Sequence, residues 1–140
     1  MPSLVAPARA RPPLFPSLMS FPASCFVLTL LTDIVYASSY NMTWETASVW
    51  LLTVGLLAAL VIVLVGLFQA FFQGRWPSMA SRIGYAIALI LAIFNAFVHS
   101  RDGYTSVVPT GLTLSVISVI LLLAMEVVER FATPRRETVA

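Results

Sequence analysis

Four polar residues stand out in a strongly apolar chain, and they are the residues that could do chemistry: Asp33, Asn95, His99 and Arg101. A carboxylate, an imidazole and a guanidinium can pair with one another, hold a proton or contact a ligand. Asn95 and His99 are one helical turn apart. Ionisable groups inside a membrane are rare and face the protein interior. We therefore expect these residues to form one hydrogen-bonded and ion-paired cluster.

Two interpretations of this cluster stay open. In the first, Arg101 or His99 neutralises Asp33 and fixes the register of the helices, since a half-satisfied buried charge is not tolerated. In the second, the cluster is a proton relay or binds a ligand. His99 is the single histidine, so two axial His ligands for one haem cannot come from this chain. The sequence predicts no metal site and no cofactor. The minor alternatives are His99 as an axial ligand to haem or a chlorin pigment, and a bound quinone.

Other kinds of active site have little support in the sequence. We find no Ser–His–Asp arrangement and no glycine-rich phosphate loop, and we predict that the chain is not an enzyme. Cys25 is the single cysteine, which excludes an intrachain disulfide and a CxxC-type metal or redox site. The basic residues are scattered and form no basic stripe, so nucleic-acid binding is not expected.

The elements that must position the cluster are membrane-spanning helices. Of the 140 residues, 59% are hydrophobic and 10% are charged, whereas a soluble domain has roughly 25% charged residues. A single span needs ~20 mainly apolar residues. The chain has four such stretches, at about 21–39, 47–72, 82–99 and 107–131. Short connections make sequential spans antiparallel. The prediction is an all-α membrane protein, a four-transmembrane up-down-up-down helix bundle.

The arginines predict the orientation of this bundle. Seven of the eight basic residues fall on one side: Arg9, Arg11, Arg75, Arg82, Arg130, Arg135 and Arg136. The other side has Arg101 alone. Positive residues mark the cytoplasmic side. We therefore expect a multi-pass protein of the bacterial cytoplasmic (inner) membrane with both termini cytoplasmic (N-in/C-in). Residues 1–20 would form a proline-rich cytoplasmic arm before the 21–131 domain, and 132–140 a cytoplasmic tail.

Small residues at helical spacing predict where helices pack closely, because lipid tails provide no hydrophobic drive between helices. The stripe on the third span is formed by Gly84, Ala88, Ala92 and Ala96. The stripe on the fourth span begins with Gly111 and Ser115. The simpler interpretation is packing within the bundle. The alternative is that a stripe docks a partner protein or a flat cofactor. The expected partners are membrane lipids and other membrane protein subunits.

Several stretches resemble a family of small bacterial predicted membrane proteins, domain-of-unknown-function family twenty-two thirty-one. They include LLTDI at 30–34 and, most specifically, FNAFVHSRD at 94–102. The likeness covers about residues 15–129. The family has no settled activity. Its members usually carry a His-Pro pair before the first span and an Asp near the end of the second. Here Phe15-Pro16 and Gln69 stand at those places. This departure from the family pattern favours a protein whose role is to provide a contact surface.

Two function classes follow. The first is a non-catalytic accessory or structural subunit of a larger bacterial membrane complex, with a photosynthetic or respiratory electron-transfer assembly as the host. The alternative is a small haem- or quinone-binding protein that handles electrons or protons near Asp33 and His99.

Overall fold

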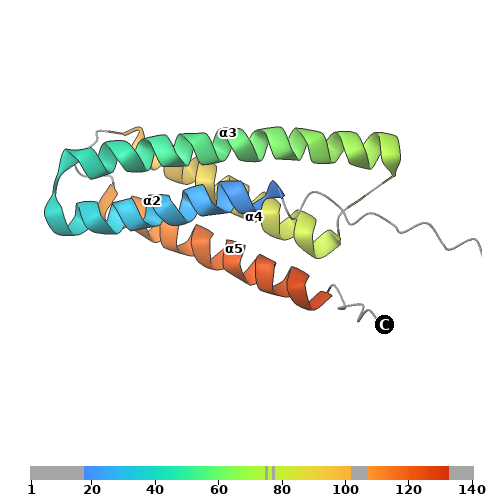
Figure 1. Ribbon diagram of the computed structural model, residues 1–140. Coiled ribbons are helices and arrows are strands. Elements are labelled where there is room, and N and C mark those ends of the chain that lie inside the picture. Colours follow the sequence, from blue (N-terminus) through green and yellow to red (C-terminus); the bar gives the residue numbers. More distant parts are fainter. Residues whose placement is uncertain (1–17, 75, 77, 102–106, 133–140) are drawn as a thin grey trace, which may run out of the picture.

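Four long helices make up the part of the chain that the structure describes (Figure 1). The computed structural model describes residues 18–74, 76, 78–101 and 107–132. The helices are α2 (Ser20–Ser39), α3 (Met42–Gln73), α4 (Met79–His99) and α5 (Leu112–Ala132), and a short π-helical turn, η1 (Val107–Gly111), precedes α5. The described residues include no strand. Each of the four helical segments is long and apolar enough to cross a membrane. The predicted all-α, four-span membrane fold is confirmed.

Parts of the sequence-based predictions lie outside the described residues. Residues 1–17 include most of the expected proline-rich arm, and residues 133–140 include nearly all of the expected tail. Arg75 and residues 102–106 are also outside. The N-in/C-in orientation stays a prediction.

The first connection is shorter than the sequence suggested. Only Tyr40 and Asn41 separate α2 from α3, whereas the second span was expected to begin near residue 47. The Asn41 side chain explains the early start, because its Oδ1 accepts a hydrogen bond from the Thr43 backbone N–H at 3.0 Å and so caps α3. Residues 42–46 are therefore helical, and their side chains can face the bundle.

The starts of the last two spans also differ from expectation. α4 begins at Met79 because the Ser78 hydroxyl accepts a hydrogen bond from the Ser81 N–H at 3.1 Å. Before α5, Val108 has non-helical backbone dihedrals, so the regular helix begins only at Leu112 and η1 contains Pro109.

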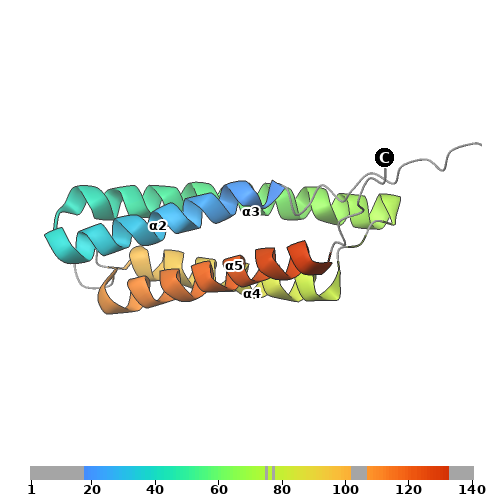
Figure 2. The same ribbon diagram turned by 60° about the horizontal axis from the view of Figure 1, so that its bottom comes forward.

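The helices form two antiparallel hairpins, α2–α3 and α4–α5, which lie against each other as two layers (Figure 2). α2 contacts both α3 and α5, and α4 contacts mainly α5, whereas the α3–α4 contact is sparser. We call the end with the α2–α3 connection the His99 end and the end with the α3–α4 connection the Arg82 end. The grooves described below lie between α3 and α4, where the helix contact is sparser.

Glycine permits the closest helix contacts. A Cβ atom built on Gly55 of α3 would lie 2.9 Å from Phe26 Cε1 of α2. A Cβ atom built on Gly84 of α4 would overlap Met125 Sδ of α5. Neither site has room for a larger residue without a shift of its neighbour. Glycine therefore lets the two helices within each hairpin pack closely, as expected for helices in lipid.

The predicted small-residue stripes face this interior. Gly84, Ala88 and Ala92 are buried, and Ala96 is half-buried. On the last span, Gly111, Ser115 and Ser118 are also buried. The stripes are therefore covered by the protein's own helices, and a partner or flat cofactor would have to displace them.

Candidate functional site

Asp33 is at the centre of the polar cluster and has no exposed surface. It belongs to the buried face of α2, together with Cys25, Thr29, Thr32 and Tyr36. These residues recur at spacings of three and four, which places them on one side of a helix. The periodicity of α2 therefore directs the carboxylate into the bundle.

Each of the other three helices provides a partner for this carboxylate. The Ser48 hydroxyl of α3 donates to Asp33 Oδ1, and His99 Nε2 of α4 lies 3.1 Å from the same oxygen. The Ser115 hydroxyl of α5 donates to Asp33 Oδ2 at 2.6 Å. All four spans thus meet at one side chain, which fixes their register along the bundle.

The His99 ring is held at both nitrogens, and its side chain is 1% exposed. Nδ1 lies 2.9 Å from the Asn95 carbonyl oxygen, one turn earlier in α4. A carbonyl oxygen can only accept a hydrogen bond, so Nδ1 carries a proton. The contact between Nε2 and Asp33 Oδ1 is favourable when a second proton lies between them. The pair then contains either an imidazolium and a carboxylate, or a neutral imidazole and a protonated carboxyl.

The Asn95 side chain extends the network away from His99. Its Nδ2 donates to Ser115 Oγ at 2.8 Å, and Ser115 in turn donates to Asp33. Asn95 Oδ1 and Ser118 Oγ are buried without a hydrogen-bond partner among the described residues. Both residues line a cavity of about 10 Å³, close to the space that one water molecule needs.

A second acid, Glu45, is buried at the His99 end of α3. The residue is 5% exposed, and its Oε2 has no hydrogen-bond partner among the described residues. Glu45 lies near enough to His99 to interact with it electrostatically. Asp33 therefore contacts the imidazole directly, and Glu45 is a second acid within its electrostatic range. Because a single imidazolium balances one negative charge, both acids cannot be ionised and neutralised by His99 alone.

The comparisons with known proteins address the family. The family model described as "Predicted membrane protein (DUF2231)" matches residues 11–127, which is most of the chain. The chain belongs to this family. The resemblance inferred from the residues around His99 is therefore confirmed. No curated protein and no solved structure matches the chain.

The matched DUF2231 region contains every predicted cluster residue, and the structure brings three of them together. Asp33, Asn95 and His99 are in contact through the network described above. The hydrogen bonds to Asp33 come from Ser48, His99 and Ser115, and Arg101 is exposed, so the expected place of Arg101 in the cluster stays a prediction. α4 ends at His99, and the chain has left the helix before Arg101, which keeps this charged side chain at the surface.

The sequence did not identify Ser48 or Glu45 as site residues. It also did not identify Ser115 as a hydrogen-bond donor to Asp33. Glu45, Ser48, Leu52 and Gly55 are all buried on α3 at spacings of three and four. This pattern was present in the sequence, but the predicted start of the span near residue 47 left Glu45 in a loop. Ser115 was interpreted as a small packing residue, although its hydroxyl is the donor to Asp33 Oδ2.

The cluster offers little to a metal or haem. Among the described residues, no group of three or more His, Cys, Asp or Glu side chains could hold a metal ion. An apolar groove of about 340 Å³ between α3 and α4 reaches His99. However, the two ring nitrogens are engaged by Asp33 and Asn95. Axial ligation by His99 would require one of these contacts to break.

Proposed function

We propose that the protein is a non-catalytic structural subunit of a larger membrane assembly, in which the Asp33 cluster clamps the four helices in one register. The observation that carries this proposal is the complete burial of Asp33, with both carboxylate oxygens bound by residues of the other helices. A substrate site needs access and free polar groups, whereas both carboxylate oxygens of Asp33 are occupied inside the bundle, which favours a role in selecting one packing of the helices.

The surface of α3 supports a role in assembly. This helix has 32 residues, which corresponds to about 48 Å, whereas the hydrocarbon core is about 30 Å thick. Its last turns present Phe68, Phe71 and Phe72, which are 58%, 71% and 76% exposed. Large exposed aromatic side chains are characteristic of protein interfaces. We place the contact with a neighbouring subunit on this part of α3.

The test is gentle detergent extraction of the tagged protein, followed by size-exclusion chromatography, an absorbance spectrum and mass spectrometry. Co-migration with larger subunits, and no pigment on this chain after they are stripped, supports the proposal. Subunits that carry redox cofactors would identify the host as the respiratory or photosynthetic electron-transfer type. Purification of a lone protein or a small homo-oligomer would overturn the proposed role as a subunit.

A pair of matched variants locates the interface. Phe71→Ala removes an aromatic side chain from the proposed contact, and Phe94→Ala removes one that is 59% exposed on α4. Co-purification should fall for Phe71→Ala and stay unchanged for Phe94→Ala. Equal behaviour of the two variants would contradict this interface.

Glu45 favours a second candidate function, proton handling. The Glu45 carboxyl is buried, has an oxygen without a partner among the described residues and lies near an Asp–His pair that shares a proton, so it is the next acceptor for that proton. In proteoliposomes with an imposed potential and an internal pH dye, Glu45→Gln should abolish proton uptake, and Glu126→Gln, an exposed acid on α5, should not. No uptake by the unmodified protein would remove this candidate.

A further inference from the structure

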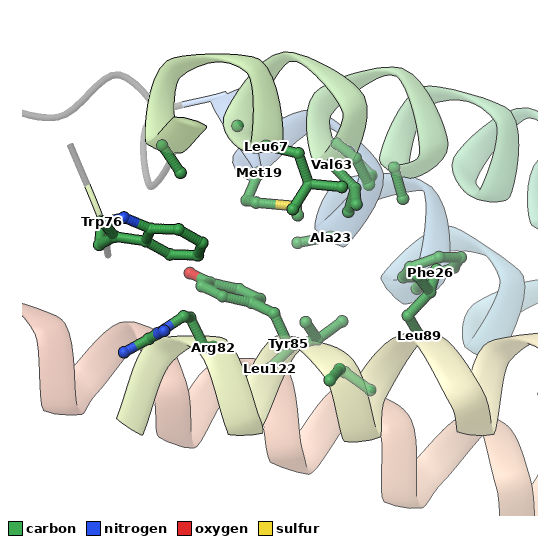
Figure 3. A pocket seen from close by; sticks show the side chains of 16 residues that line it. Met19, Ala23, Phe26, Val63, Leu67, Trp76, Arg82, Tyr85, Leu89 and Leu122 are labelled. Carbon is green, nitrogen blue, oxygen red and sulfur yellow. The ribbon is translucent and has the colours of Figure 1, made fainter. Parts of the chain in front are cut away.

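A second large cavity lies at the Arg82 end, between α3 and α4 and in front of α2 (Figure 3). Its volume is about 300 Å³, at the lower end of the range of about 300–1,000 Å³ for ligand pockets. The space exists because α3 and α4 make few contacts with each other. The groove opens toward the space that lipid fills around a membrane bundle.

The walls of the groove are apolar along most of its length. Its deep end is closed by Phe26 and Leu89, and Val63 and Leu67 of α3 form one side (Figure 3). Polar atoms are concentrated at the other end, at Trp76, Arg82 and Tyr85 (Figure 3). A long apolar slot with a polar mouth is complementary to an amphiphile that has one hydrocarbon chain in the slot and its head at the mouth.

The charge at the mouth is positive. The Arg82 guanidinium is exposed and lies 5.3 Å from the centre of the Trp76 ring. Arg82 also belongs to the first turn of α4, where the helix dipole adds positive potential. Among the described residues, those that line the groove include no Asp or Glu. The head group that fits this mouth is therefore an anion, and guanidinium groups bind phosphate with charge-assisted hydrogen bonds.

We propose that this groove binds an anionic phospholipid, with one acyl chain in the slot and the phosphate on the Arg82 guanidinium. The bilayer supplies such a lipid at the mouth, and basic pockets between spans are known to select anionic head groups. Tyr85 and Trp76 are placed at the height of the head group, where aromatic residues with a polar edge prefer to lie. The site is independent of the Asp33 cluster and of the proposed role as a subunit.

The test compares two lipids with identical acyl chains, phosphatidylglycerol and phosphatidylcholine. The full-length protein is delipidated in mild detergent, and each lipid is titrated and followed by native mass spectrometry. Both lipids carry the phosphate, but the choline cation of phosphatidylcholine is repelled by the Arg82 guanidinium, so we expect phosphatidylglycerol to bind roughly tenfold more tightly. Arg82→Gln should bring the two affinities close to parity. Arg101→Gln, an exposed arginine at the His99 end, should leave the preference unchanged.

A second pair of variants tests the slot. Ala23 of α2 lines the groove, whereas the adjacent Ser24 is exposed and does not. Ala23→Phe should fill the slot and weaken binding of both lipids at least tenfold, and Ser24→Phe should not. Ala86→Phe, at an exposed position that also lines the groove, serves the same purpose if Ala23→Phe unfolds.

Three results would overturn the proposal: equal affinities for the two lipids in the unmodified protein, a tenfold preference that survives Arg82→Gln, or binding that is insensitive to both groove-filling variants. Extraction of a prenylquinone in place of phospholipid from the untreated protein would also overturn it.

Discussion

Single residues decide whether the buried cluster stabilises or destabilises the protein. Asp33 is bound by Ser48, His99 and Ser115, each from a different helix. Removal of one partner from a buried ion pair costs more than the pair contributes, because the groups left behind keep their desolvation penalty without compensation. Asp33 and Glu45 are opposite cases, since the first has a full set of donors and the second has an oxygen with none among the described residues.

Asp33→Ala should lower the free energy of unfolding by about 3 kcal/mol, because a buried imidazole and two buried hydroxyl groups lose the carboxylate that pairs with them. The measurement is SDS-induced unfolding in mixed micelles. Ser38→Ala, which removes an exposed hydroxyl from the same helix, is the control and should change little. In a double-mutant cycle, His99→Ala should cost much less in the Asp33→Ala background. Additive effects of the two changes would show that the residues do not interact.

Glu45→Met should raise the free energy of unfolding by about 1 kcal/mol. It replaces a buried carboxyl, one oxygen of which has no partner in the described part of the chain, by an apolar side chain of similar length. Glu45→Gln keeps polar atoms at the site and should give a smaller change. The same SDS titration measures both. A clear loss of stability in Glu45→Met would mean that the electrostatic interaction with His99 outweighs the desolvation of the acid.

At the scale of the elements, helix ends and helix contacts depend on small residues. Asn41 and Ser78 cap α3 and α4 and start both helices earlier than hydropathy indicates. Gly84 lets α5 approach α4 so closely that Met125 covers it. Caps and close contacts contribute little to average hydropathy, which is why the spans were visible in the sequence and their starts were not.

Gly84→Ala should destabilise the α4–α5 contact by about 1–3 kcal/mol, since the added methyl group would overlap the Met125 side chain. Met125 is flexible and can absorb part of this strain. Met125→Ala makes room for the methyl group. Gly84→Ala should therefore cost less stability when it is added to the Met125→Ala variant than when it is added to the unmodified protein. Thermal unfolding in detergent measures each species. A Gly84→Ala variant as stable as the unmodified protein would mean that the two helices separate at little cost.

For the whole molecule, hydropathy and loop length were enough to predict the number of spans and their antiparallel order. A buried charge must be neutralised, and the sequence offered His99 and Arg101 at the same end as Asp33; the structure pairs Asp33 with His99. Ser48, Ser115 and the exposed position of Arg101 were not predictable, since they depend on the rotation of each helix about its axis. The spacing of small and polar residues indicates which face of a helix turns inward, but packing among the helices decides which of these side chains meet.

The orientation in the membrane is the last prediction, and it follows from the arginine distribution. Ser100 is exposed at the His99 end and Ser78 is exposed at the Arg82 end. In a Cys25→Ala background, Ser100→Cys should react with a membrane-impermeant maleimide in intact spheroplasts, and Ser78→Cys should react only after permeabilisation. The reverse pattern would place the Arg82 end outside. In that case the lipid bound by the groove would come from the outer leaflet of the membrane, and the Asp33 cluster would lie near the cytoplasm.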